Sequence, residues 1–87
     1  MEVKEYVLDC RRMTSRAEAH DHLAEVFGFP EYYGRNLDAL HDCLTELPAC
    51  RIRLEWPWAL GKLGRYAVSL MQVFLDSAEE NGGIELI

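Results

Sequence analysis

Apolar and polar residues alternate along this chain with two different periods, and the period changes where one element gives way to the next. Strict alternation in RIRLEW, Arg51 to Trp56, predicts a half-buried strand. The short apolar run YVL within Val3 to Cys10 predicts a first strand, and Ile84 to Ile87 predicts a last one. Between these segments the apolar residues recur at helical spacing.

The first helical segment has signals at both ends. Ser15 followed by Glu18 has the spacing of a capping box, which predicts a helix start. Gly28 is placed to end this helix, and Pro30 prevents its continuation. The residues expected on one face of this helix are His20, Leu23 and Phe27.

The second helical segment begins near Asn36, a favourable N-cap residue, and is expected to close at Pro48. One apolar stripe runs along it at i, i+3, i+7 and i+10, formed by Leu37, Leu40, Leu44 and Leu47. This stripe predicts that one face of the helix packs on a core.

Two further helical segments lie between the second and third strands. PWALGKLG, Pro57 to Gly64, predicts a short helix, and Tyr66 to Glu80 predicts a longer one. The order is therefore β-α-α-β-α-α-β, with crossovers long enough for parallel pairing. We expect an α/β fold in one domain over residues 1–87, with a three-stranded, mainly parallel sheet covered by about four helices.

The composition narrows the class of partner. The 87 residues are 49% apolar and 28% charged, as in an ordinary soluble globular protein. No apolar run has the length of a membrane-spanning helix, and MEVKEYVLDC lacks the basic start and apolar core of a signal peptide, so we expect a cytosolic protein. The net charge of −6 argues against direct contact with nucleic acids and anionic membranes, and it permits steering toward a basic partner.

The cysteines and histidines predict neither a metal nor a cofactor. Cys10, Cys43 and Cys50 form an odd set without C-x-x-C or zinc spacing. We expect reduced thiols, with Cys10 and Cys43 packed as small apolar residues; a Cys43–Cys50 disulfide is the alternative. His20 and His22 lie two apart, whereas helical metal ligands lie four apart, so we expect His20 at the edge of the core.

Two further sequence features, a glycine motif and a pair of tryptophans, are expected to have structural rather than ligand-binding roles. GKLG, Gly61 to Gly64, is similar to the G-x-x-G loop of KH domains, but the acidic net charge opposes binding of a nucleic-acid backbone. Trp56 and Trp58 are expected in the core and at its edge rather than in a ligand cage.

A row of carboxylates, Asp38, Asp42 and Glu46, occupies the face of the second helix opposite the leucines. Like charges four residues apart repel by about 0.2–0.5 kcal/mol per pair, and no lysine or arginine within this helix offsets that repulsion. The row is either a plain solvated face or a surface that a basic partner neutralises. Acid–base catalysis is a weaker alternative, because a helix surface offers no cleft and because His41 and Asp42 point about 100° apart.

Two adjacent tyrosines, Tyr32 and Tyr33, precede this helix, and Gly34 allows a turn between them and the helix. They are either loop residues that cover the core or anchors of a protein interface, where tyrosine is enriched. Beside an acidic face they form a patch suited to a protein with a basic cleft.

The segment PEYYGRNLDALHDCL, Pro30 to Leu44, resembles the signature of the barstar family, intracellular inhibitors of the secreted ribonuclease barnase. The similarity continues through LEW at Leu54–Trp56 and QVF at Gln72–Phe74, and the order of elements agrees over nearly the whole chain. The resemblance implies a three-stranded parallel sheet with helices, in a stoichiometric inhibitor that performs no chemistry of its own.

The resemblance also implies how such an inhibitor binds, since in this family the second helix and the tyrosine loop enter the ribonuclease active site. Asp42 matches the family's central acid, which lies where the substrate phosphate would sit, and Asp38 matches a neighbouring acid. A carboxylate in this position mimics phosphate, because it accepts charge-assisted hydrogen bonds from arginines of the enzyme. His41 and Leu47 depart from the family pattern, where the prototype has tryptophans, and Asp76 stands where it has glutamate.

The expected partner is a basic, extracellular-type ribonuclease, bound one-to-one by a chain that is monomeric when free. The alternative is an immunity or interaction module that binds a different basic toxin through the same patch. We further expect that a proton on His41 would oppose a basic partner. The expected contact residues are Tyr32, Tyr33, Gly34, Asn36, Asp38, His41, Asp42, Thr45, Glu46 and Asp76.

Overall fold

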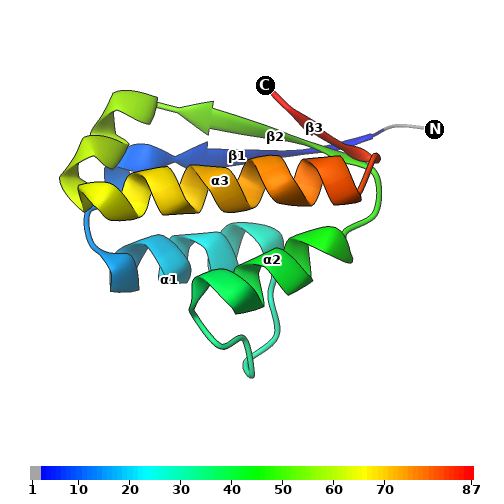
Figure 1. The fold of residues 1–87 in the computed structure, drawn as a ribbon, viewed down its shortest axis with the longest axis horizontal. Coiled ribbons are helices and arrows are strands. Elements are labelled where there is room, and N and C mark those ends of the chain that lie inside the picture. Colours follow the sequence, from blue (N-terminus) through cyan, green and yellow to red (C-terminus); the bar gives the residue numbers. More distant parts are fainter. Residues whose placement is uncertain (1–2) are drawn as a thin grey trace.

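The computed structural model describes residues 3–87 and confirms the predicted α/β architecture (Figure 1). Three α-helices and two short 3-10 helices, labelled η, connect three strands. In chain order the elements are β1 (Lys4–Asp9), η1 (Cys10–Arg12), α1 (Arg16–Phe27), α2 (Leu37–Thr45), β2 (Cys50–Glu55), η2 (Pro57–Leu63), α3 (Arg65–Glu80) and β3 (Ile84–Leu86).

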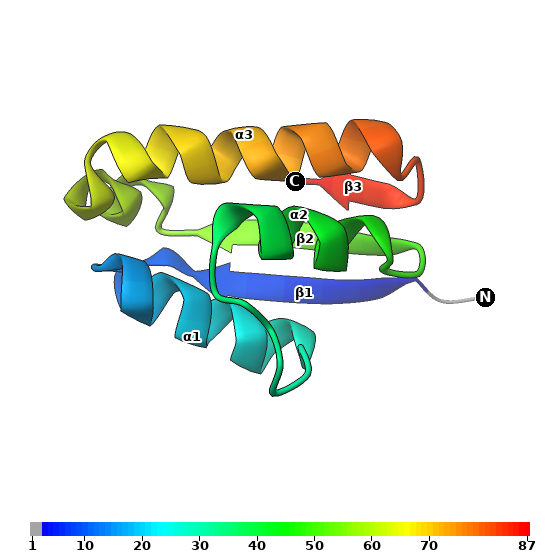
Figure 2. The ribbon, with the colours of Figure 1, turned by 60° about the horizontal axis from the view of Figure 1, so that its bottom comes forward.

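The strands form one parallel sheet in the order β1-β2-β3. β1 and β2 pair over their full lengths, from Lys4 opposite Cys50 to Asp9 opposite Glu55, whereas β3 pairs only with the first half of β2. All three α-helices lie on one face of the sheet and run in the same direction, opposite to the strands (Figures 1 and 2). The three helices therefore begin at one end of the molecule and finish at the other.

The core lies between the sheet and this helical layer. Strand residues such as Tyr6, Leu8 and Ile52 point inward and are buried, while their neighbours along each strand are exposed. The helices contribute Leu23, Phe27, Leu40, Leu44, Leu70 and Phe74. The outer face of the sheet carries ion pairs across the strands, Arg53 to Glu5 at 2.7 Å and Arg51 to Glu85 at 3.2 Å.

The predicted helix signals are found in place. The hydroxyl of Ser15 accepts a hydrogen bond from the N–H of Glu18, and Gly28 ends α1 in the left-handed conformation with φ of 69°. The side-chain oxygen of Asn36 accepts from the N–H of Ala39 and caps α2.

α2 stops at Thr45, earlier than the expected end at Pro48. The side-chain amide of Asn81, at the end of α3, donates to the carbonyls of Leu44, Thr45 and Leu47 at 3.4, 3.2 and 2.8 Å. These carbonyls find their donor on another element, so the chain leaves the helix without a further turn. Leu47 consequently lies outside the helix, and Glu46 is the C-cap residue.

The two tryptophans were expected in the core or at its edge, and this prediction is wrong. Trp56 is 43% exposed and Trp58 is 72% exposed. Their rings meet edge to face at 6.1 Å, and the guanidinium of Arg11 lies over Trp56 at 4.5 Å. The two rings thus pack on each other and on an arginine at the surface, instead of entering the core.

The cysteines are free thiols: Cys10 and Cys50 are buried and Cys43 is half-buried. Burial raises the pKa of the Cys43 thiol, and the nearby Glu46 and Asp42 carboxylates raise it further, which keeps the sulfur protonated. Within residues 3–87, no helix combines the length and the apolar character needed to cross a membrane.

Candidate protein-binding surface

The row of carboxylates on α2 faces solvent. Asp38, Asp42 and Glu46 are exposed, with 82% of the Asp42 side chain accessible, while Leu40 and Leu44 on the opposite side are fully buried. Such exposure is typical of a contact surface, whereas the carboxylates of acid–base catalysis are tuned by burial and close neighbours.

The arginine nearest to this row in sequence does not neutralise it. Arg35 makes an ion pair with Asp21 of α1 at 2.7 Å and donates to the carbonyl of Ala17, also on α1, at 3.1 Å. These contacts hold its guanidinium on another helix. Arg35 therefore makes no ion pair with the row, although it lines a cavity together with Arg16 and Asp38.

α3 brings further carboxylates to α2. His41 contacts Glu80 and lies 3.9 Å from Asp42, and a cavity of about 300 Å³ beside it is lined by Asp76, Glu79 and Glu80. The carboxylate of Glu80 on α3 lies closer to the His41 ring than that of its sequence neighbour Asp42. We define the acidic surface as Asp38, Asp42 and Glu46 of α2 together with Asp76, Glu79 and Glu80 of α3.

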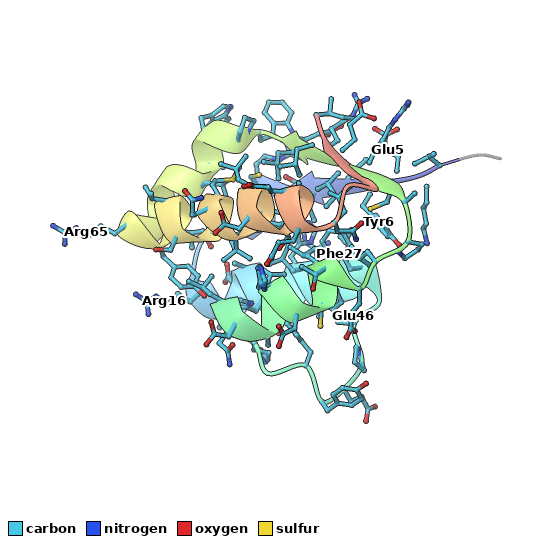
Figure 3. The ribbon with its side chains drawn as sticks, turned by 45° about the vertical axis from the view of Figure 1, so that its right-hand side comes forward. Glu5, Tyr6, Arg16, Phe27, Glu46 and Arg65 are labelled. Atoms are coloured by element: carbon cyan, nitrogen blue, oxygen red, sulfur yellow. The ribbon has the colours of Figure 1, made fainter. Side chains whose placement is uncertain are left out.

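Three of the six acids on this surface, Glu46, Glu79 and Glu80, lie where acids are least favourable to folding, whereas Asp38 lies in the first turn of α2, where the dipole favours a carboxylate. Glu46 caps the C-terminus of α2, Glu79 and Glu80 end α3, and the last turns of both helices contain no basic residue. Carboxylates at helix C-termini oppose the helix dipole, by about 0.3–1 kcal/mol each. In Figure 3, Glu46 lies near the end of α2, while Arg16 and Arg65 project from the opposite end of the molecule. The acids at the helix C-termini thus lie away from these two arginines, whereas Asp38 lines a cavity together with Arg16 and Arg35.

The structure separates the two tyrosines. Tyr32 is 88% exposed and presents its ring to solvent, next to a cavity that Glu46 also lines. Tyr33 is 7% exposed, and its hydroxyl lies 2.6 Å from Nδ1 of His20. Burial raises the pKa of the Tyr33 hydroxyl well above its usual range, so the hydroxyl stays protonated. In the free chain only Tyr32 offers its side chain to a partner, and Tyr33 anchors the loop.

Buried His20 connects this anchor to the start of α3. Its second ring nitrogen, Nε2, lies 2.6 Å from the hydroxyl of Tyr66. His20 is 2% exposed, as expected for a residue of the core edge, and burial lowers its pKa, with Arg35 adding to the effect. One histidine thereby links α1, the tyrosine loop and α3.

The small predicted contact residues shape the loop and the helix end. A Cβ on Gly34 would lie 3.2 Å from Nδ2 of Asn36 and 3.3 Å from Cβ of Ala39, so a larger residue would crowd the cap. Asn36 also donates to the carbonyl of Gly34 at 3.3 Å. The hydroxyl of Thr45 donates to the carbonyl of Asp42 at 2.9 Å. Gly34 and Asn36 therefore fix how the tyrosine loop enters α2, and Thr45 bonds to the backbone in the last turn of that helix.

Glu79 and Glu80 were not among the residues expected from the sequence. The available signal was Asp76 followed four residues later by Glu80, near a helix end without lysine or arginine. Among residues 3–87, no group of three or more histidine, cysteine, aspartate or glutamate side chains is arranged to hold a metal ion.

The fold and this surface define a class: a small α/β protein that exposes an acidic helix face beside a loop with an exposed tyrosine. The sequence matches the Barstar family, described as Barstar (barnase inhibitor), over residues 3–86, and the chain belongs to that family. It is also 36% identical over 81 residues to a Bacillus subtilis (strain 168) protein named "Putative ribonuclease inhibitor YrdF", a match covering 90% of this chain and 89% of that protein.

Proposed function

We propose that this chain is a stoichiometric inhibitor of a barnase-type ribonuclease, and that the acidic surface and Tyr32 block the active site of that enzyme. The chain itself carries out no reaction. One observation carries the proposal: Asp42 stands exposed between unneutralised Glu46 and the α3 acids, at the dipole end that disfavours them. A basic cleft relieves this repulsion.

Membership of the Barstar family and the printed name of the relative support a ribonuclease as the partner. The geometry supports mimicry of phosphate, since the Asp42 side chain is 82% exposed on the side of α2 that faces away from the core. In a desolvated cleft, carboxylate–arginine hydrogen bonds are shorter and stronger than neutral ones. Long-range attraction between this surface and a basic enzyme would also accelerate association.

The test is inhibition of a purified barnase-type ribonuclease by the wild type and by Asp42→Ala. We expect the variant to lose about 30-fold or more in affinity, because a hot-spot residue contributes about 2 kcal/mol or more. The matched control is Glu55→Ala, which removes one negative charge from the outer face of the sheet. Association should slow strongly with added salt. Inhibition that is equal for all three proteins would refute the proposal.

The alternative partner is a different basic toxin that binds the same surface. One observation favours this alternative: His41 and Asp76, which both depart from the family pattern, line one cavity on the acidic surface. A chain that fails to inhibit barnase-type ribonucleases, and that binds a non-nuclease toxin in an Asp42-dependent way, would decide for the alternative.

A further inference from the structure

A stripe of five exposed residues runs along the outer side of α3, away from both the core and the sheet. It follows the helical spacing i, i+3, i+7, i+10 and i+14. We call it the outer stripe, and it consists of Arg65, Val68, Gln72, Leu75 and Glu79. Val68 is 72% exposed and Leu75 is 53% exposed, so two branched apolar side chains stand in solvent on one helix.

An apolar groove borders the stripe. It has a volume of about 590 Å³ and lies between α3 and η2, where β3 has ended and no longer covers β2. Its lining includes Leu54, Trp58, Leu60 and Met71, together with Val68 and Leu75 of the stripe. Exposed Trp58 adds to the same patch. Contiguous apolar surface of this kind usually marks an interaction site.

The outer stripe is complementary in charge to the outer stripe of a second copy that runs in the opposite direction. Its order along the helix is basic, apolar, polar, apolar, acidic. A second α3 lying antiparallel, with a two-fold axis beside Gln72, would place Arg65 opposite Glu79 of the other copy, and Val68 opposite Leu75. Neither Arg65 nor Glu79 has an ion-pair partner within residues 3–87, so both are free to pair. Antiparallel helices also oppose their dipoles favourably.

We propose that a second copy of this chain occupies this face, in a two-fold symmetric dimer formed by antiparallel contact between the outer stripes. Each contact then occurs twice, as an isologous interface requires. The charges at the two ends of the stripe select this partner, because only a reversed copy brings opposite charges together at both ends. The interface is small, so the dimer forms at micromolar or higher concentrations.

The dimer would also cover part of the acidic surface. The side-chain amide of Gln72 donates to Asp76 at 2.9 Å, and Glu79 belongs to both surfaces. Self-association and target binding would therefore compete. This consequence rests on the proposed function, but the dimer itself does not.

The experiment is sedimentation equilibrium of the isolated chain over a wide concentration range, with no ribonuclease present. Val68→Ser should raise the dimer dissociation constant about tenfold, since loss of a contact of about 1.4 kcal/mol has that effect. Val7→Ser is the matched control, because Val7 is an exposed valine on the outer face of the sheet. Arg65→Glu should weaken the dimer similarly, and the double variant Arg65→Glu/Glu79→Arg should restore it. Circular dichroism checks that every variant is folded.

Three results would overturn the proposal. The first is a wild type that stays monomeric throughout. The second is a dimer that Val68→Ser and Arg65→Glu leave unchanged, which would place the contact elsewhere. The third is a failure of the double charge reversal to restore association. A monomeric wild type whose ribonuclease binding is weakened by Val68→Ser would assign the groove to the target interface instead.

Discussion

The hydrogen bonds of His20 should stabilise the fold by linking α3 to the loop that carries Tyr32, and this contribution can be measured. The substitution Tyr66→Phe removes one hydroxyl and leaves the aromatic ring, so the stacking of Arg16 over that ring, at 4.5 Å, can persist. What is lost is the partner of Nε2 of His20, which lies 2.6 Å from the hydroxyl. Because His20 is only 2% exposed, its ring nitrogen is then left without a partner in the core.

A buried polar group that loses its partner costs about 1–3 kcal/mol. Tyr66 is only partly buried and lines an open cavity, so water can replace some of the lost interaction. We therefore expect a loss of about 1–2 kcal/mol in the free energy of unfolding. For a domain of this size each kcal/mol lowers Tm by about 4–8 °C, so Tm should fall by about 5–15 °C.

Thermal and urea unfolding, followed by circular dichroism, measure this change. The matched control is Tyr32→Phe, which removes a hydroxyl from a side chain that is 88% exposed and should leave stability within about 0.5 kcal/mol. If Tyr66→Phe were as stable as Tyr32→Phe, the histidine would not depend on this hydroxyl. The inferred link between α3 and the tyrosine loop would then be refuted.

Two further predictions concern charge on histidines and beside the acidic surface. Burial lowers the pKa of His20 and of His22 below the usual histidine value of 6.5, so below about pH 6.5 these two histidines bind more protons in the unfolded chain than in the folded chain. The free energy of unfolding should fall as pH drops below this value, with a limiting slope of about 1.4 kcal/mol per pH unit for each histidine. His22→Gln should reduce this slope, measured by urea unfolding at several pH values. Equal slopes for the wild type and the variant would contradict this account. On the acidic surface, His41 lies beside Asp42 and Glu80, so His41→Lys, which places a fixed positive charge there, should weaken binding of a basic ribonuclease. The neutral variant His41→Gln is the control for this effect of charge, measured by titration calorimetry, and equal affinities for the two variants would exclude charge at position 41 as the cause.

Local sequence signals predicted the elements because those signals act locally. Alternation in Arg51 to Trp56 and the caps at Ser15 and Asn36 depend on neighbours within a few residues, and the structure contains the corresponding strand and helix starts. The end of α2 was predicted too late because its carbonyls are satisfied by Asn81, more than thirty residues away. No local signal announces such a donor.

The candidate surface was predictable only on α2. The spacing of Asp38, Asp42 and Glu46 placed them opposite the leucines, and their exposure agrees with that placement. Adjacent Tyr32 and Tyr33 could not be told apart by sequence, since only the packing of the loop over His20 buries one ring and exposes the other. The tryptophans were misplaced because their apolar character favours burial, whereas the two rings pack on each other and on Arg11 at the surface.

The sequence by itself determined the order of elements, the faces of the helices and the acidic row, because periodicity and capping are properties of neighbouring residues. Tertiary structure alone decided that α3 would bring Glu79 and Glu80 to His41, and that the outer stripe of α3 would stay uncovered beside an apolar groove. Both outcomes depend on how a parallel helical layer packs over a sheet whose third strand is short. That packing joins residues far apart in the chain, and spacing along one helix cannot report it.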